Sequence, residues 1–261
     1  MKKTLFVVSD IHGFYNELVS ALKESGFDEN NESHLLIVCG DLFDRGPDSV
    51  KVFEYLYNLE NNGKAIVIKG NHDEMLVDYL TGKNKSPWNY MKNGTNETLG
   101  DFWHRTNPFE SWAILEKKAE YGTQELFEEW LTLVRNDISK EYPRLIEWLD
   151  NLPYYYETKN HIFTHAAIDI TAEDWHFPHI PWKDLIWDDG SFFGKPIKNT
   201  DKTVVIGHFG TSHLRELYSL DFEKEPYETL EREDGRVIAL DTTTVLSHKV
   251  NVLLILEDEL I

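Results

Sequence analysis

The chain has a single cysteine, no long apolar run and comparatively few basic residues. With Cys39 alone among 261 residues, an internal disulfide is impossible. No stretch reaches the ~20 apolar residues of a membrane-spanning helix, and the apolar run near the start ends at Ser9, too early for a secretion signal. The 46 acidic residues outnumber the 26 basic ones, and the net charge of -20 argues against a nucleic-acid or anionic-membrane partner. We therefore expect a soluble cytoplasmic protein.

What the chain does have is three polar clusters, each directly after a short apolar run rich in β-branched residues. The runs cover residues 5–8, 35–39 and 65–68, and the clusters cover residues 10–12, 40–46 and 70–73. Short apolar runs bounded by turn residues are typical of buried parallel strands. Apolar residues recur at helical spacing over 14–26 and 49–59, between the runs. This alternation of strand and helix predicts parallel βαβ units and an α/β fold.

Further strands are predicted in the second half of the chain. Residues 162–164 and 203–206 are apolar runs that end in His165 and in Gly207-His208. Residues 216–220, 236–240 and 250–256 alternate or run apolar, which is typical of short strands. We expect these strands to form a second sheet packed on the first.

Between these parts, from about residue 75 to 150, the chain is rich in Trp, Glu and Leu and has no β-rich run. The pattern predicts several helices, most clearly over 121–134 and 143–149. No flexible linker flanks the segment, so we expect a helical insertion that leans over the site within a single domain of residues 1–261. Its tryptophans, including Trp103 and Trp130, are expected to fill its own core. Residues 93–99 are predicted to form a loop that meets the site.

The reactive crevice of an open α/β sheet lies beyond the carboxyl ends of the strands, so the clusters are predicted to meet there. Asp10 and His12 are two residues apart at a strand end and should point to one side. A carboxylate with an imidazole suits a divalent metal such as Mn, Fe, Zn or Ni. Asp41 follows Gly40 and is placed to bridge two metals. Taken singly, each aspartate has an alternative as a helix cap, and His12 as a solvent-facing residue.

The other clusters add ligand and acid-base side chains. Asn71 offers an amide oxygen to a second metal, and His165 and His208 offer imidazole nitrogens. His72 has the pKa range of a general acid, and Arg45 carries a planar fork that matches phosphate oxygens. Alone, a strand-end histidine is more often structural and an arginine is more often part of a surface salt bridge. Six ligand-type residues at five predicted strand ends nevertheless favour a two-metal site for phosphate chemistry.

Taken together, these motifs resemble the five motifs of calcineurin-like metallophosphoesterases. The matching segments are Asp10-x-His12, Gly40-Asp41-x-x-Asp44-Arg45-Gly46, Gly70-Asn71-His72-Asp73, His165 and Gly207-His208. The chain is most similar to the phosphoprotein phosphatase branch, which includes bacterial and phage serine/threonine phosphatases. The resemblance implies an αββα sandwich of two mixed sheets around two divalent transition metals. Mn is the first expectation for these metals, with Fe, Zn and Ni as alternatives.

The resemblance also implies a role for each residue. The implied ligands are Asp10, His12 and Asp41 for the first metal, and Asp41, Asn71, His165 and His208 for the second. His72 would be the general acid, oriented by Asp44. Arg45 would bind the phosphoryl group together with Asn71. Hydrolysis would proceed by in-line attack of a hydroxide that bridges the two metals.

Two positions depart from the family pattern. Asp73 stands where eukaryotic protein phosphatases usually have Glu. The Asp form also occurs in bacterial members and in symmetrical dinucleoside tetraphosphate hydrolases. A second phosphate-binding arginine is expected near residues 186–189, but none stands there, and Arg215 is the candidate replacement as a substrate-binding residue.

The leading hypothesis is a metal-dependent phosphomonoesterase that acts on phosphoserine and phosphothreonine in proteins or on small phosphoesters. The alternative, favoured by Asp73, is a symmetrical dinucleoside tetraphosphate hydrolase, although the intact Asp44-Arg45 pair is less typical of those enzymes. A non-catalytic binding module predicts decay of a ligand or of the acid, and none has decayed. A nuclease role is disfavoured by the acidic composition and the lack of basic-aromatic patches.

Overall fold

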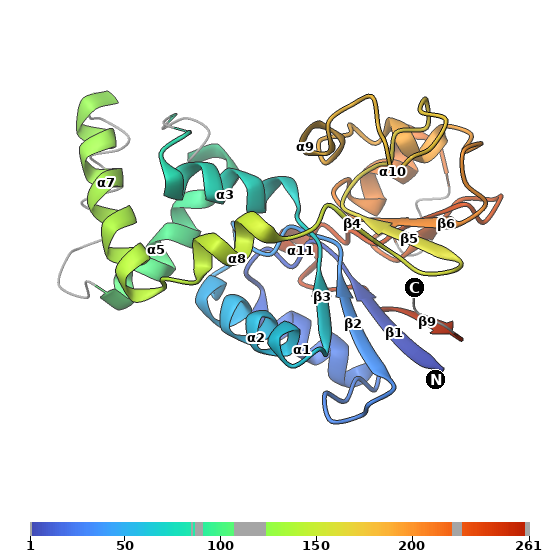
Figure 1. Ribbon diagram of the computed structural model, residues 1–261, viewed down its shortest axis with the longest axis horizontal. Helices are drawn as coiled ribbons and strands as arrows, with labels where there is room; N and C mark the ends of the chain where they lie inside the picture. The colour runs from blue at the N-terminus through green and yellow to red at the C-terminus, as the bar shows by residue number, and fades with distance from the viewer. Residues whose placement is uncertain (1, 85, 87–90, 107–123, 221–225, 259–261) are drawn as a thin grey trace.

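Two mixed β-sheets form the centre of the protein, which is described from a computed structural model (Figure 1). The structure describes residues 2–84, 86, 91–106, 124–220 and 226–258. In the first sheet, β1 (Lys3–Val8), β2 (His34–Val38) and β3 (Ala65–Val67) are parallel neighbours. Strand β9 (Leu253–Glu257) pairs antiparallel with β1, so the strand order is β3-β2-β1-β9. The three predicted strands of the first half are confirmed.

The second sheet has the strand order β4-β5-β6-β8-β7. Its central strands β5 (His161–Thr164), β6 (Thr203–Ile206) and β8 (Val237–Ala239) are parallel. The outer strands β4 (Tyr155–Glu157) and β7 (Leu230–Glu231) pair antiparallel with their neighbours. The expected αββα sandwich of two mixed sheets is therefore confirmed, and β4 and β7 are strands that the apolar pattern had not indicated.

Apolar side chains from both sheets pack against each other in the middle of the sandwich. Leu5 and Val7 of β1 meet Phe163 and Val205 of the second sheet in one buried cluster, which also contains Cys39. Period-two alternation sends the intervening β1 residues to the other face, where Phe6 and Val8 pack under the helices. These helices are α1 (Tyr15–Glu24) and α2 (Ser49–Asn61), which confirm the predicted ones. A third cluster covers the outer face of the second sheet, beside α9 (Trp182–Leu185), η1 (Ser191–Gly194) and α10 (Thr211–Leu217).

The predicted insertion is helical and extends away from the sheets on the left of Figure 1. It contains α3 (Asn71–Thr81), α5 (Thr95–Thr106), α7 (Gln124–Glu141) and α8 (Leu145–Asn151). Residues 121–123 of the predicted helix lie outside the described residues. Trp103 and Trp130 are buried as expected, but their apolar cluster is continuous with α1 and α2. The prediction of a separate core for the insertion was therefore wrong, because its helices pack against α2, where Phe53 contacts Phe102 of α5 and Trp148 of α8.

The predicted strand at residues 216–220 was wrong, and the predicted strand at residues 250–256 exists but lies in the other sheet. Residues 216–220 are not a strand, because helix α10 reaches Leu217, and the buried Leu214 and half-buried Tyr218 have the four-residue spacing of one helix face. Residues 250–256 do contain a strand, but β9 belongs to the first sheet instead of the second. An apolar run predicts a strand, but it does not indicate which other strand pairs with it. The short helix α11 (Thr244–Ser247) precedes β9.

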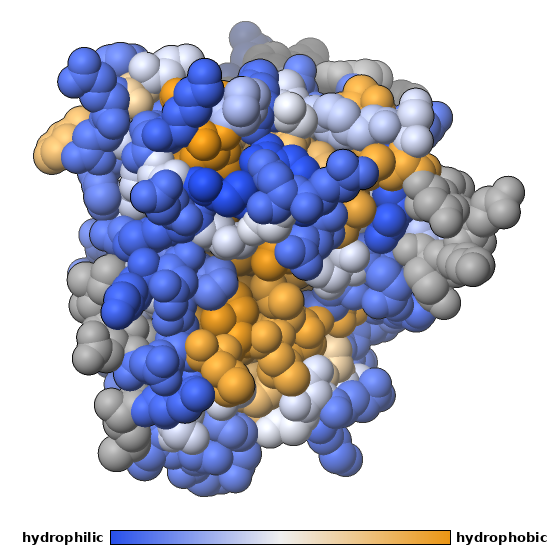
Figure 2. Space-filling model, turned by 90° about the vertical axis from the view of Figure 1, so that its right-hand side faces the viewer, coloured by the Kyte–Doolittle hydropathy of each residue, from blue (hydrophilic) through white to orange (hydrophobic). Residues whose placement is uncertain are grey.

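The edge strand β9 alternates between the interior and solvent. Ile255 and Glu257 are buried, whereas Leu254 and Leu256 are 52% and 64% exposed. Figure 2 shows this side of the molecule, where polar side chains surround an apolar patch in the lower middle of the view. Among the described helices, none is both long and apolar enough to cross a membrane.

Candidate active site

The residues that follow five parallel strands of the two sheets come together at one end of the sandwich. They are Asp10 after β1, Asp41 after β2, Asn71 after β3, His165 after β5 and His208 after β6. Contacts between the sheets join them, because His165 reaches Asn71 and the backbone N–H of His208 reaches Asp10. The first four are buried and His208 is half-buried. The predicted convergence at the strand ends is therefore present.

Much of this cluster has a left-handed backbone. The φ angle lies between 49° and 72° at Asp10, His12, Asp41, Asp44, Arg45 and His208. A non-glycine residue in this region costs of order 1–3 kcal/mol, and the surrounding fold has to hold it there. Because β1 ends at Val8, the strand alternation invoked for Asp10 and His12 does not apply. Their side chains are placed by these turns instead, and they make different contacts.

The loops after β2 and β3 touch at Gly40. This residue has a φ of 86°, and a Cβ placed on it would lie 2.6 Å from Nδ1 of His165 and 2.7 Å from the backbone of Gly70. No side chain fits there, so glycine is required by both conformation and space. The close approach allows Asp41, the next residue, to lie between groups from both sheets.

One group of lone-pair atoms lies around Oδ1 of Asp41. His165 donates its Nδ1–H to the carbonyl oxygen of Cys39 at 2.8 Å, which leaves Nε2 of the neutral imidazole without a proton. This Nε2 lies 2.8 Å from Oδ1 of Asn71, 3.2 Å from Nδ1 of His208 and 3.3 Å from Oδ1 of Asp41. Acceptors this close need a proton or a cation between them. The donor set of nitrogen and oxygen atoms fits a first-row divalent metal ion.

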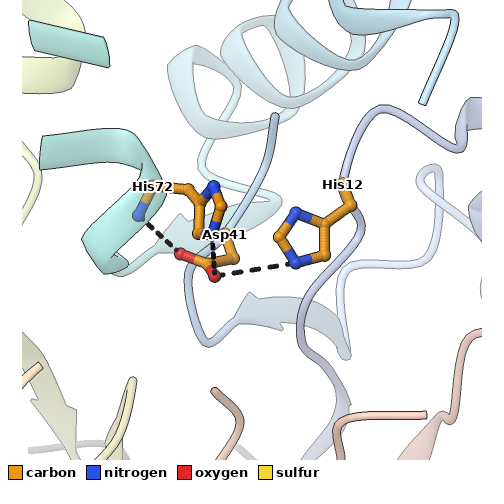
Figure 3. A group of neighbouring side chains, drawn as sticks. All are labelled: His12, Asp41 and His72. Carbon is orange, nitrogen blue, oxygen red and sulfur yellow. Dashed lines mark hydrogen bonds and ion pairs between the residues drawn. The ribbon is translucent and has the colours of Figure 1, made fainter. Parts of the chain in front are cut away.

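A second group lies around the other oxygen of the same carboxylate (Figure 3). His12 donates its Nδ1–H to the carbonyl oxygen of Phe43 at 2.8 Å, and its Nε2 lies 3.7 Å from Oδ2 of Asp41. Nε2 of His72 lies 4.0 Å from the same oxygen. Asp41 thus presents one oxygen to each of two groups that can hold a metal ion. The geometry fits the bridging position expected for it.

Asp10 contributes buried negative charge next to both groups. Its carboxylate accepts the backbone N–H of His208 at 3.0 Å and the hydroxyl of Ser9. Burial raises the pKa of Asp10 well above its ordinary value, and the nearby carboxylates of Asp241 and Asp41 raise it further. Burial likewise raises the pKa of Asp41. Buried carboxylates that raise one another's pKa are the setting in which a bound cation is stabilising.

His72 and Asp44 form a hydrogen-bonded pair beside the two groups. Nδ1 of His72 donates to Oδ2 of Asp44 at 2.7 Å, and the hydroxyls of Thr95 and Thr98 donate to the same carboxylate. Burial raises the pKa of Asp44 to about 7, against the lowering effect of hydrogen bonds from Thr98 and Thr95. The pair holds the His72 ring with Nε2 facing the site. The contact fits the roles that the family resemblance implies for these two residues.

The guanidinium of Arg45 is hydrogen-bonded to the imidazoles of both His12 and His72. Its Nη1 donates to Nε2 of His12 at 2.7 Å and its Nη2 donates to Nε2 of His72 at 3.0 Å. Burial, and then the charge of Arg45, lower the pKa of both histidines. A metal on Nε2 of His12 would displace the first hydrogen bond, because one lone pair cannot serve both. Arg45 would then be available to a phosphoryl oxygen.

Residues 186–189, where the family pattern leads one to expect a second phosphate-binding arginine, carry the exposed indole ring of Trp187 instead. Trp187 is 49% exposed, and its ring centroid lies 6.5 Å from that of His208 in an edge-on arrangement. Burial lowers the pKa of His208 to about 4, although the charge of Asp188 opposes this. The guanidinium of Arg215 donates to the backbone carbonyls of Glu228 and Thr229 at 3.3 and 3.5 Å. Among the described contacts, none joins Arg215 to the metal-ligand groups.

Asp73 was noted from the sequence only as a departure from the family pattern. In the structure its carboxylate binds backbone N–H groups of the loops that carry the site residues. Its carboxylate accepts the N–H groups of Gly70, Asp41 and Leu42 at 2.8 to 3.0 Å. It therefore caps the start of α3 and ties the loop after β2 to it. A carboxylate three residues after a glycine, at the start of an apolar helix, was the sequence signal for this role.

A comparison with family models gives a match over residues 3–241 to the calcineurin-like phosphoesterases. The chain belongs to this family. The match covers every described strand except β9, and it includes all the candidate site residues described above. For this calcineurin-like phosphoesterase, bound divalent metals are therefore the expected state of the two groups around Asp41, and the donor atoms present fit them.

Curated relatives match only part of the chain. A symmetrical bis(5'-nucleosyl)-tetraphosphatase of Buchnera aphidicola subsp. Schizaphis graminum (strain Sg) is 43% identical over 89 residues, which are 34% of this chain and 31% of the relative. An asymmetrical bis(5'-nucleosyl)-tetraphosphatase of Bacillus subtilis (strain 168) is 34% identical over 82 residues, 29% of this chain and 34% of the relative. The aligned part is thus about a third of each relative's length.

Solved structures show a similar fold over nearly the whole chain. A cold-active protein-tyrosine phosphatase of a psychrophile, Shewanella sp., matches with a TM-score of 0.52 at 17% identity, over 97% of this chain and 75% of that one. A point mutant of a cold-active protein tyrosine phosphatase gives a TM-score of 0.53 at 17% identity, again over 97% of this chain and 75% of that one. At this identity the likeness shows the shared fold.

Proposed function

We propose that this calcineurin-like phosphoesterase is a metal-dependent phosphomonoesterase that acts on phosphoserine and phosphothreonine in proteins or on small phosphoesters. The observation that carries the proposal is the His72–Asp44 pair, placed with Arg45 beside a carboxylate shared by two metal-ligand groups. A proton donor, a cationic fork and two groups of ligands are the parts that phosphoester hydrolysis requires. We propose two divalent transition metals in the centre, Mn first, with Fe, Zn or Ni as alternatives.

The proposed ligands share Asp41, and they add Asp10 to the group that contains His12 and Asn71 to the group that contains His165 and His208, while His72 is kept as the acid. Asp10, His12 and Asp41 would hold the first ion, and Asp41, Asn71, His165 and His208 would hold the second. Support for the second set is direct, since its four lone-pair atoms face one another. When bound, the metals lower the pKa of water and neutralise charge on the phosphoryl group.

The chain's own residues supply binding and proton transfer. Arg45 would bind the phosphoryl oxygens through its two terminal nitrogens, with Asn71 beside it. In the reaction, water gives a proton to the solvent as the bond from its oxygen to phosphorus forms, and the bond from phosphorus to the leaving oxygen breaks. His72, protonated on Nε2, would give that proton to the leaving alkoxide, while its Nδ1–H remains hydrogen-bonded to Asp44. A substrate role for Arg215 stays a prediction.

The test is hydrolysis of p-nitrophenyl phosphate and of a phosphoserine peptide by metal-stripped protein, with and without added Mn²⁺. We expect metal-dependent turnover of both. In the His72→Asn variant, turnover of the peptide should fall about 10²–10⁴-fold, the usual contribution of a general acid. His179→Asn, an exposed histidine outside the site, is the matched control. Absence of turnover with any divalent metal bound would overturn the proposal.

A second candidate is hydrolysis of dinucleoside tetraphosphates. Two observations favour it: the names of the relatives that match part of the chain, and the exposed Trp187 ring beside His208, which offers a stacking surface to a base. Diadenosine tetraphosphate incubated with the metal-loaded protein would give two ADP by symmetrical cleavage, or ATP and AMP by asymmetrical cleavage. If neither product forms while the phosphopeptide is hydrolysed, the first proposal stands alone.

A further inference from the structure

The start of helix α5 makes a close contact with Asp44 of the candidate acid pair, although Thr95 and Thr98 are 51 and 54 residues from Asp44 in the chain. Oγ1 of Thr98 donates to Oδ1 of Asp44 at 2.8 Å and accepts the backbone N–H of Asp44 at 2.7 Å. Oγ1 of Thr95 donates to Oδ2 of Asp44 at 3.1 Å. The backbone N–H of Arg45 donates to the carbonyl oxygen of Gly94 at 3.3 Å.

These contacts leave the Asp44 carboxylate little freedom. Asp44, Thr95 and Thr98 are all fully buried, so water cannot replace a lost hydroxyl easily. Thr98 binds both the side chain and the backbone of Asp44, and so it fixes the orientation of the carboxylate relative to the main chain. The remaining strong contact of the carboxylate is with Nδ1 of His72 at 2.7 Å. The direction of that bond sets the plane of the imidazole and therefore where Nε2 points.

We propose that Thr98, assisted by Thr95, is a positioning residue that holds Asp44 so that His72 can deliver its proton to the leaving group. The inference rests on the proposed phosphoesterase function and deepens it. It gives the helical insertion a part in catalysis, because α5 belongs to the insertion and Asp44 to the sheet loops. Residues 93–99 were predicted to form a loop that meets the site. The segment does contact Asp44, but Thr95 and Thr98 belong to a helix instead of a loop.

The competing explanation is that the hydroxyls only satisfy a buried carboxylate and stabilise the fold. The two explanations differ in which substrates suffer when a hydroxyl is removed. A proton donor matters for a basic leaving group and hardly matters for one that departs as a stable anion. Loss of stability or of metal binding would slow all substrates alike.

The experiment compares phenyl phosphate, which has a basic leaving group, with 2,4-dinitrophenyl phosphate, which does not. Thr98→Val keeps the shape of the side chain and removes the hydroxyl. We expect its kcat to fall about 10–100-fold on phenyl phosphate and less than about threefold on the dinitrophenyl ester, with KM and bound Mn²⁺ unchanged. Thr98→Ser should restore most of the lost activity, and Thr95→Val should show a smaller effect, as its hydrogen bond is longer. Thr132→Val, the same change on α7 of the insertion, is the control.

A double-mutant cycle with His72→Asn completes the test. If Thr98 acts through His72, Thr98→Val should have little further effect in the His72→Asn background. An equal loss on both esters, or independent effects of the two changes, would overturn the positioning role while the phosphoesterase function stands. A wild-type protein that hydrolyses neither ester would instead overturn the proposed function, and this inference with it.

Discussion

The two sheets build their shares of the candidate site in different ways. The loops of the first sheet are tied to one another by backbone hydrogen bonds, such as His12 N–H to the carbonyl of Asp41 at 3.0 Å and Gly46 N–H to the carbonyl of His12 at 2.8 Å. The second sheet has a comparable bond, from Gly207 N–H to the carbonyl of His165 at 2.8 Å, but its contribution is two imidazoles, with His165 directly after β5 and His208 two residues after β6. The first half carries the shared carboxylate, the proposed acid and Arg45, while the described residues of the second half contribute ligands to one of the two groups. We infer that the chemistry is concentrated in the first half.

The strongest test of this difference between the two halves is to remove the carboxylate of Asp41, which both ligand groups share. Asp41→Asn takes one charged oxygen from both ligand groups, so both ions should be weakened. We expect fewer than two Mn²⁺ per chain and a fall in turnover of at least about 10³-fold, since the metals supply several kcal/mol of transition-state stabilisation. Metal analysis after dialysis, together with kcat, checks this. Asp78→Asn, a partly exposed position on α3, is the control.

A smaller loss of metal binding and turnover is expected when a ligand from the second half of the chain is removed. His208→Asn removes a ligand from one group only, so one Mn²⁺ should stay tightly bound while the other is weakened. Turnover at saturating Mn²⁺ should fall about 10²-fold, less than for Asp41→Asn. Calorimetric titration with Mn²⁺ separates the two sites. Equal weakening of both ions would show that the two halves do not divide the ligands as we describe.

The smallest effect should come from a carboxylate of the second half that lies outside the ligand groups. Asp169 accepts the backbone N–H groups of Thr171, His179 and Ile180. Burial acts to raise its pKa, but the hydrogen bonds from the Thr171 hydroxyl and these backbone groups outweigh burial and lower the pKa to about 2. Because this pKa is below the value of ~3.9 in the unfolded chain, the stabilisation is present above that pH and is lost as the pH falls toward 2.

Asp169→Asn should therefore lower the free energy of unfolding by about 1–3 kcal/mol near neutral pH. The difference from the wild type should shrink as the pH falls from 4 to about 2. Urea unfolding at a series of pH values measures it, with Asp174→Asn as an exposed control on the same loop. Bound Mn²⁺ and turnover at neutral pH should change little. A large loss of either would show that the second half contributes more to the chemistry than one ligand group.

Much of the candidate site was predictable because its signals are local. Asp41 and Asn71 each follow an apolar strand, and parallel strands bring their carboxyl ends to one place. The strand-end histidines His165 and His208 were found by the same reasoning, and the resemblance to a known family then supplied a role for each. Asp10 and His12 do lie beside Asp41, as expected, but strand alternation is not the cause. Turns with positive φ place both residues.

Some features had no local signal. Strand β9 pairs with β1 at the edge of the first sheet, and its apolar pattern would fit an edge of either sheet. Arg215 was proposed from chain position alone, and in the structure its guanidinium contacts the backbone carbonyl of Glu228. Asp73 accepts N–H groups from Asp41 and Leu42, 32 and 31 residues away, and from Gly70 in the adjacent turn. The hydrogen bonds between Thr98 and Asp44 join segments that are 54 residues apart.

The sequence by itself determined the strand ends, the ligand types at them and the family, because apolar periodicity and short motifs act over a few residues. Only the tertiary structure decided the rest: one carboxylate shared by two groups, β9 beside β1, and the insertion helix α5 against Asp44. These arrangements depend on packing and hydrogen bonding between distant segments. No pattern within one segment specifies which distant backbone or side chain will meet it.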